Sequence, residues 1–293
     1  MDCIPLAGAV KRTHTVVLFH GLCAAPLELA FLATHLRQAG FTVETPTIEG
    51  YSYGSPAARW RSWVDRASAI VRSLQQKASG GVSVGGLSMG ATLALAVAAE
   101  VDGISSVVAL STTLRYDGWA VPWYRFLFPL GHRLGLGRFY TYKESEPFGL
   151  KNEQLRAHVK KALANNQVSE IGGDSISAEH LAEADRLCSH VKRKLAQVCA
   201  DLLVIHAIDD EVASPRNADM VMSRAGSVNR KAIFLGNSYH IITVDNERET
   251  VCSEVEFFLR GIVAAGEGSA GRKLFPVVAP EWARYLRQNR RYG

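Results

Sequence analysis

The chain has 293 residues, 47 % of them hydrophobic and 21 % charged, a composition typical of a soluble α/β domain with room for an insertion. No apolar run approaches the roughly 18 residues of a membrane-spanning helix, and the first residues lack the charge order of a signal peptide. We therefore expect a cytoplasmic protein without an integral membrane segment. The net charge is +5, but residues 264–293 alone carry +4, so the rest is nearly neutral and no nucleic-acid partner is expected.

The first third of the chain alternates between short apolar runs and amphipathic stretches. Apolar, β-branched runs predict strands at Thr15–Phe19 and at residues 41–46, 82–86 and 104–110. Helical patterns fill the intervals at residues 26–39 and 57–77 and from residue 89 onward. Strands that alternate with helices over this length predict an α/β fold, a parallel sheet with helices on both faces.

A G-x-S-x-G motif, Gly86-Leu87-Ser88-Met89-Gly90, lies between the third of these strands and its helix. A serine on such a sharp turn projects its hydroxyl above the sheet, and the strained, tightly packed turn needs small residues on both sides. Because the helix begins at the serine, its free N–H groups lie where an oxyanion would form. This context predicts that Ser88 is a nucleophile, the alternative being an ordinary serine in a Gly-rich turn.

The alternation stops after Ser111 and resumes with a strand at residues 202–206. We interpret residues 114–200 as a cap inserted over the edge of the sheet where ligands bind in open α/β folds. Two helices are predicted in it, one near residues 155–163 and one that follows Ser177 as N-cap. The cap is rich in aromatic residues, which either roof an apolar pocket or fill its own core. The pocket candidates in the cap are Trp119, Trp123 and Phe126.

The end of the domain supplies candidate partners for the serine. A serine hydroxyl needs a base and a group that orients the base. Asp209 and Asp210 follow the strand at residues 202–206, and His240 follows a last strand at residues 231–235. The order Ser…Asp…His is that of α/β-hydrolases, in which each member lies in a loop above the sheet. A helix at about residues 247–263 completes the domain.

Together these motifs resemble the carboxylesterase and monoacylglycerol-lipase group of the α/β-hydrolase superfamily. The matching pieces are His20-Gly21-Leu22, the G-x-S-x-G motif, Asp210-Glu211-Val212 with Pro215, and Asn237-Ser238-Tyr239-His240 running into Val244-Asp245. In that family the carboxylate precedes an x-V-x-x-P run, which selects Asp210 over Asp209. The resemblance implies nucleophile Ser88, base His240, orienting acid Asp210 and an oxyanion hole from the backbone N–H groups of Leu22 and Met89. The Met89 donor follows from the geometry of the motif as well.

The chain also departs from that family. A Gly-His-Gly sequence, frequent in the family, is replaced by Gly50-Tyr51-Ser52-Tyr53-Gly54 in a loop that borders the pocket, so Tyr51 becomes a further pocket candidate. The first strands of a complete hydrolase sheet are missing before Thr15, which predicts a shortened sheet of about six strands. The predicted organisation is a hydrolase core (residues 1–113 and 201–263), the cap (residues 114–200) and a basic C-terminal extension (residues 264–293).

The expected function is hydrolysis of a small-molecule carboxylic ester with an apolar acyl chain, through an acyl-enzyme on Ser88 and without a metal or organic cofactor. The alternatives are a thioesterase or acyltransferase with the same triad, a peptidase, and a ligand-binding protein that has lost catalysis. The five cysteines are scattered without C-x-x-C spacing and are expected to be buried thiols rather than disulfides or zinc ligands. The basic extension is expected to pack on the body, to stay loose, or to make weak contact with acidic surfaces.

Overall fold

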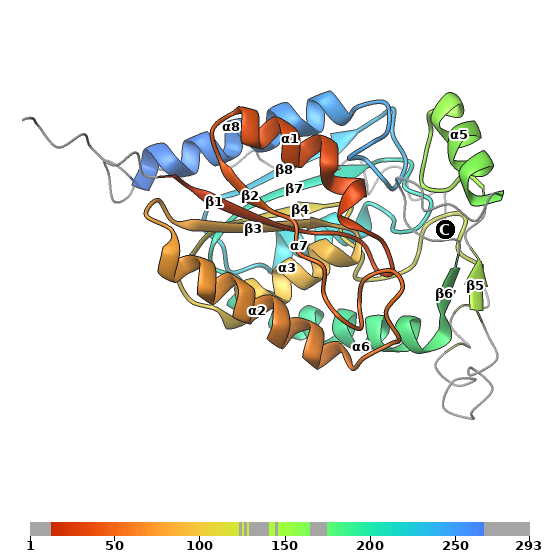
Figure 1. The fold of residues 1–293 in the computed structure, drawn as a ribbon, viewed down its shortest axis with the longest axis horizontal. Coiled ribbons are helices and arrows are strands. Elements are labelled where there is room, and N and C mark those ends of the chain that lie inside the picture. Colours follow the sequence, from red (N-terminus) through yellow and green to blue (C-terminus); the bar gives the residue numbers. More distant parts are fainter. Residues whose placement is uncertain are drawn as a thin grey trace, which may run out of the picture.

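A computed structural model describes residues 13–122, 125, 128, 141–143, 146–164 and 175–266 of the chain. Within these residues, six parallel strands form one sheet in the order β2-β1-β3-β4-β7-β8, with helices on both faces (Figure 1). The predicted α/β class and the shortened, six-stranded sheet are confirmed.

The strands of the sheet lie close to the predicted positions. They are β1 (Thr15–Phe19), β2 (Thr42–Glu44), β3 (Val82–Leu87), β4 (Ile104–Leu110), β7 (Asp201–Ala207) and β8 (Arg230–Leu235). The inner strand β3 is buried along its whole length, as expected of a parallel strand covered on both faces. The edge strand β2 is shorter than predicted, and only its central Val43 is buried.

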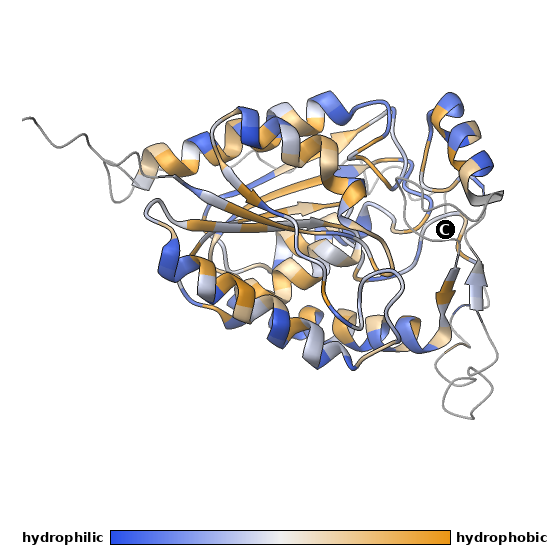
Figure 2. Ribbon diagram, in the orientation of Figure 1, coloured by the Kyte–Doolittle hydropathy of each residue, from blue (hydrophilic) through white to orange (hydrophobic). Residues whose placement is uncertain are grey.

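Alternate side chains of the strands enter two separate hydrophobic layers, because successive residues of a strand point to opposite faces. Val16 and Leu18 pack in the layer under α1 (Ala30–Gln38) and α8 (Arg248–Gly266). Val17 and Phe19 pack in the opposite layer, under α2 (Trp60–Lys77), α3 (Met89–Glu100) and α6 (Ala178–Lys194). Figure 2 shows the apolar faces of these helices turned toward the sheet.

The remaining elements are short. A 3-10 helix, η1 (Pro26–Leu29), leads into α1, and a second, η4 (Leu195–Gln197), follows α6. The sequence analysis assigned no element to α7 (Arg216–Arg224), which packs beside β7 and β8. No described helix combines the length and the apolar character needed to cross a membrane.

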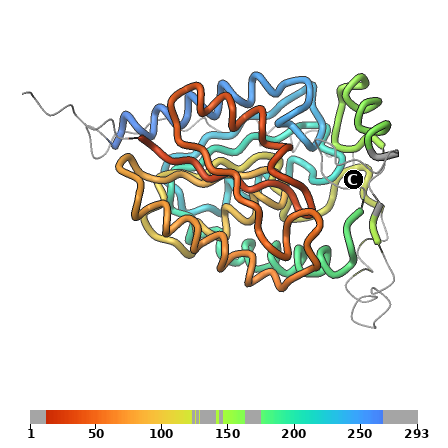
Figure 3. Tube along the Cα trace, viewed as in Figure 1, coloured from red at the N-terminus to blue at the C-terminus, as the bar shows by residue number. Residues whose placement is uncertain are grey.

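One part of the segment between β4 and β7 lies beyond the ends of the main strands, and another part belongs to the core layer. The short strands β5 (Thr141–Lys143) and β6 (Ser175–Ser177) pair antiparallel, and with α5 (Glu153–Ala164) they lie past the carboxyl ends of the main strands (Figure 3). Helix α6 instead runs along α2 and α3 in the core layer. Its predicted N-cap is confirmed, since the Ser177 side chain accepts a hydrogen bond from the His180 N–H. We therefore propose that the cap consists only of residues outside the core layer and ends before α6.

The expectation of buried cysteines holds for three of the described residues, and most of the basic extension lies outside the described part of the chain. Cys23, Cys188 and Cys252 are buried thiols as expected, but Cys199 is exposed, which corrects that expectation for this residue. Cys3 and residues 267–293, which make up nearly all of the predicted basic extension, lie outside the described residues.

Candidate active site

Ser88 occupies a strained turn between β3 and α3. Its backbone has φ 57° and ψ −120°, a conformation that residues with a side chain rarely adopt. The chain is too crowded there for larger residues, because a Cβ on Gly90 would lie 2.0 Å from the Phe19 carbonyl oxygen. A Cβ on Gly86 would lie 2.4 Å from the Gly90 carbonyl carbon. The two glycines of the motif therefore allow strand and helix to meet with the serine hydroxyl at the turn.

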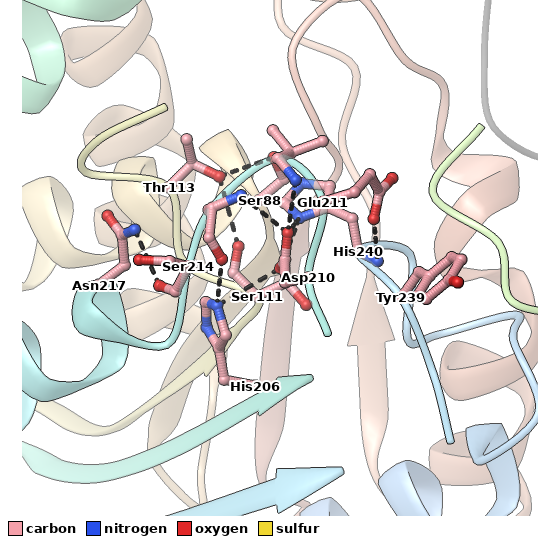
Figure 4. A network of polar contacts seen from close by, with 12 residues as sticks. Ser88, Ser111, Thr113, His206, Asp210, Glu211, Ser214, Asn217, Tyr239 and His240 are labelled. Atoms are coloured by element: carbon pink, nitrogen blue, oxygen red, sulfur yellow. Dashed lines mark hydrogen bonds and ion pairs between the residues drawn. The ribbon is translucent and has the colours of Figure 1, made fainter. Parts of the chain in front are cut away.

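The side chains of Ser88, His240 and Asp210 form one hydrogen-bonded line (Figure 4). His240 Nε2 lies 2.8 Å from Ser88 Oγ, and His240 Nδ1 lies 2.8 Å and 2.9 Å from the two carboxylate oxygens of Asp210. The three residues come from loops after β3, β8 and β7, which meet at one end of the sheet. Asp209 points away and pairs with Lys151 Nζ at 2.9 Å, so the geometry favours Asp210 of the two candidates.

The environment keeps Asp210 ionised although the side chain is buried. Burial alone would raise the pKa of this carboxyl, but the neighbouring His240 and His206 and the hydrogen bond from the Ala213 N–H outweigh it and lower the pKa. The carboxylate also accepts from the Val212 N–H at 2.9 Å. An ionised Asp210 accepts a hydrogen bond from the N–H of His240 Nδ1, so the lone pair of Nε2 is directed to the Ser88 hydroxyl.

His206 lies beneath this line with its Nε2 3.4 Å from Asp210. Burial lowers the pKa of His206, so the ring is neutral, and its Nε2–H donates to the Ala213 carbonyl at 2.7 Å. His206 thereby supports the loop that carries Asp210.

Gly21 and Leu22 line the same cavity as Ser88, and together with His20 they form a loop that we call the oxyanion loop after its predicted role. Buried polar groups form hydrogen bonds with this loop and its neighbours. Tyr51 Oη donates to the His20 carbonyl at 2.6 Å, and the Cys23 N–H donates to the Tyr51 carbonyl at 3.0 Å. The buried Glu28 carboxylate accepts a hydrogen bond from the Gly21 N–H. These contacts fix the backbone that carries the Leu22 N–H, the first of the two predicted oxyanion donors. The second, the Met89 N–H, lies in the first turn of α3 next to Ser88.

A cavity of about 360 Å³ opens from Ser88 and His240. Most of its wall is apolar or aromatic, with contributions from Tyr116, Phe128, Tyr142, Phe148, Ile176 and Ile241. The acidic side chains in the wall belong to Glu28, Glu146 and Glu211. Arg125 also lines the cavity, but its guanidinium pairs with Asp185 at 2.9 Å. A largely apolar cavity with few polar groups is typical of a site for a small apolar ligand.

The predicted pocket residues are placed differently from expectation. Tyr51 has no exposed surface, and its ring packs edge-on against Trp63 behind the oxyanion loop, which corrects the prediction that it borders the pocket. Trp119 is 62 % exposed and donates from Nε1 to the Asp209 carbonyl, so it lies outside the cavity wall. Trp123 and Phe126 lie outside the described residues.

Several residues of the site escaped the sequence analysis. Thr113 Oγ1 lies 3.2 Å from Ser88 Oγ and is a second polar neighbour of the hydroxyl. Glu28 lies in an ordinary helical pattern, and only its position between two leucines hints at burial. Glu211 belongs to the Asp210-Glu211-Val212 motif, which by itself indicates no role for this residue. Among the described residues, no group of three or more His, Cys, Asp or Glu side chains is arranged to hold a metal ion.

Comparisons with known proteins agree with this architecture. The model of the family described as serine aminopeptidase, S33, matches residues 11–248. A thermostable monoacylglycerol lipase from Bacillus sp. (strain H-257) is 25 % identical over 249 residues, which are 84 % of this chain and 90 % of the relative. A carboxylesterase from Bacillus subtilis (strain 168) is 20 % identical over 251 residues, 83 % of this chain and 91 % of the relative.

Solved structures share the fold at lower identity. A soluble variant of monoglyceride lipase from Saccharomyces cerevisiae, in complex with a substrate analogue, matches with a TM-score of 0.71 at 14 % identity. The match covers 87 % of this chain and 88 % of that one. At this identity the likeness shows that the two chains have the same fold.

Proposed function

Because the chain belongs to the serine aminopeptidase S33 family of α/β hydrolases, we propose that it hydrolyses carboxylic esters with an apolar acyl chain. The observation that carries the proposal is the hydrogen-bonded line from Asp210 through His240 to Ser88, which ends at the apolar cavity. The relatives named as a monoacylglycerol lipase and a carboxylesterase favour an ester as the bond that is cleaved.

The first half of the proposed reaction forms an acyl-enzyme. His240 Nε2 takes the proton of Ser88 as Oγ attacks the ester carbonyl, and Asp210 stabilises the imidazolium through Nδ1. The backbone N–H groups of Leu22 and Met89 donate to the oxyanion of the tetrahedral intermediate. Each such donor typically contributes about 3–4 kcal/mol to transition-state stabilisation.

The second half releases the acid. After His240 has given its proton to the leaving alcohol at the end of the first half, it takes a proton from a water molecule that attacks the acyl group. The bond between Ser88 Oγ and the acyl carbon then breaks, and His240 returns the proton to Ser88 Oγ. The apolar cavity wall holds the acyl chain during both halves. A thioester substrate or a second alcohol as acceptor would use the same acyl-enzyme, so thioester hydrolysis and acyl transfer are the alternative functions.

The test compares three substrate classes on the purified protein: p-nitrophenyl esters of increasing chain length, acyl-CoA thioesters and aminoacyl p-nitroanilides. We expect turnover of the esters to exceed that of the other two classes and to vary with chain length. Ser88→Ala should reduce ester turnover by about 10³-fold or more. The matched control is Ser62→Ala, which removes the hydroxyl of a half-buried serine of α2 that donates to the Arg59 carbonyl, and it should leave the rate unchanged. A preference for the anilides or the thioesters would contradict the proposal.

A further inference from the structure

The loop that carries His240 is held by carboxylates. We call residues 236–246 the histidine loop. Three acidic side chains accept hydrogen bonds from groups that follow one another along it. Glu247 binds the Asn237 N–H at 2.7 Å, Asp245 binds the Tyr239 N–H at 2.8 Å, and Glu211 binds the His240 N–H at 3.1 Å. The position of the imidazole therefore depends on acids from more than one segment.

Glu211 differs from the other two acids in its location. It is 3 % exposed, follows Asp210 directly in the sequence and lines the cavity next to His240. Its backbone is fixed, because the Ala120 N–H donates to its carbonyl at 3.0 Å. Gly118 also packs so closely that a Cβ there would lie 2.2 Å from the Glu211 carbonyl carbon. A fixed backbone directs the carboxylate to the histidine loop (Figure 4).

We propose that Glu211 is a positioning residue of the catalytic histidine, which fixes the backbone of His240 and stabilises the imidazolium by its negative charge. The inference rests on the proposed function, in which His240 becomes an imidazolium. Two adjacent acids then share one histidine, since Asp210 binds the ring at Nδ1 and Glu211 binds the backbone N–H. Asp210 sets the tautomer, whereas Glu211 sets where the ring lies and adds a second charge to its surroundings.

The protonation of Glu211 is sensitive to its surroundings. Burial raises its pKa, the neighbouring His240 lowers it, and Asp210 raises it, with a resulting pKa of about 7. Titratable groups on the segment of Glu211 and on the segments around it belong to Asp117, Glu146, Lys151, His206, Asp209, Asp210, Tyr239, His240, Asp245 and Glu247. Glu211 therefore changes charge in the pH range in which a catalytic histidine does.

The negative charge of Glu211 is expected to raise both kcat and the pKa of His240. An ionised Glu211 favours the protonated form of His240, so it raises the pH at which His240 becomes a free base. It also stabilises the imidazolium in the transition state, so it raises kcat. Loss of this charge should lower the rate and move the acid limb of the pH profile to lower pH.

Glu211→Gln tests the inference, because the glutamine oxygen still accepts from the His240 N–H while the charge is lost. We expect kcat for a p-nitrophenyl ester to fall about 5-fold, the difference between a charged and a neutral hydrogen bond, with little change in KM. The acid limb of kcat/KM, measured from about pH 5 to pH 9, should move to lower pH. The matched control is Glu247→Gln, which removes the charge of another acid bonded to the histidine loop. Glu247 lies outside the cavity wall, so this variant should not move the limb.

Two results would overturn the inference: a Glu211→Gln profile that superposes on that of the unmodified protein, or equal losses in both variants with an unmoved limb. If Glu211→Gln fails to fold, the unmodified protein provides the test. Its acid limb should be broader than the titration of one group, because protonation of Glu211 lowers the rate only in part and lowers the pKa of His240. A limb that fits the titration of a single group contradicts the inference. Failure of the proposed function is recognised separately, by the absence of Ser88-dependent ester turnover.

Discussion

The two sides of the candidate active site are held in place by different forces. On the nucleophile side, Gly86 and Gly90 let backbones approach so closely that the turn at Ser88 has no room to move. On the histidine side, the loop of His240 is held by the carboxylates of Glu211 and Asp245, among others. Close packing leaves a spacing of small residues that can be recognised in the sequence. The hydrogen bond from the His240 N–H to Glu211, an acid of another segment, leaves no such local pattern.

The largest effect is expected for Gly90→Ala on the nucleophile side. The added Cβ would lie 2.0 Å from a backbone oxygen of β1, which cannot shift without disturbing the sheet. We expect a loss of about 3 kcal/mol or more in the free energy of unfolding, measured by urea denaturation, and loss of fluorophosphonate labelling. Gly236→Ala on the histidine side is the matched control, since its Cβ would meet nothing within 4 Å. If Gly90→Ala and Gly236→Ala lost similar amounts of unfolding free energy, the proposed difference between the two sides of the site would be contradicted.

The next largest effect is expected for Asp245→Asn on the histidine side. The buried Asp245 carboxylate accepts from the N–H groups of Tyr239, Lys151 and Asn152, so it joins the histidine loop to the segment before α5. An amide in its place turns an N–H₂ group toward some of these donors. We expect a destabilisation of about 2–3 kcal/mol and a lower kcat, measured by denaturation and steady-state kinetics. Asn246→Ala, which alters an exposed neighbour, should change stability by less than about 1 kcal/mol, and a larger change would contradict the role of Asp245.

The third effect is a dependence of stability on pH from the oxyanion loop. Burial lowers the pKa of His20 to about 4, although its hydrogen bond to the Gly21 carbonyl raises it. Between pH 6.5 and about 4 the unfolded chain therefore binds a proton that the folded protein excludes, and stability falls as pH decreases. At pH 5 the loss relative to neutral pH is about 2 kcal/mol from this group.

Urea denaturation at pH 7 and at pH 5 checks this prediction. His20→Gln removes the titrating ring, so the unfolding free energy of this variant should fall less between the two pH values than that of the unmodified protein. Burial lowers the pKa of His14 and of His206 as well, and these two groups act in the same direction in both proteins. The same decrease in both proteins would contradict the assignment to His20.

The smallest effect is expected for Thr113→Val, which tests whether a hydrogen bond contributes to holding Ser88. The Thr113 hydroxyl lies 3.2 Å from Ser88 Oγ, but packing rather than this hydrogen bond fixes the serine. The nearly isosteric variant should lower kcat by about 5-fold without a change in the free energy of unfolding. Thr113→Ser keeps a hydroxyl and should recover most of the rate. A loss far above this range in the valine variant would mean that hydrogen bonding, not packing, holds the nucleophile side.

The sequence predicted the sheet and the positions of the triad residues because those features have local patterns. Buried parallel strands are continuous apolar runs, and the turn at Ser88 is marked by its two glycines. The place of His240 after the last strand indicates its role, whereas Asp210 is indicated only by the resemblance to a family that has its carboxylate there. The structure brings these side chains within hydrogen-bond distance, while their catalytic roles stay predictions.

Other features could not be predicted because they depend on contacts between distant segments. Tyr51 reads as a loop residue near a pocket, but hydrogen bonds to the oxyanion loop place it in the core. Strands β5 and β6 have three residues each and are too short to show a period. Glu28 has the pattern of a surface charge on a helix, and only the fold turns it toward the Gly21 N–H.

The most direct test of the account is to identify the residue that a fluorophosphonate modifies, by peptide mass spectrometry, in the unmodified protein and in His240→Ala. We expect the label on Ser88 in the unmodified protein. His240→Ala should form this adduct much more slowly, because the base is lost. A label on another residue, or modification of Ser88 at the same rate without His240, would contradict it.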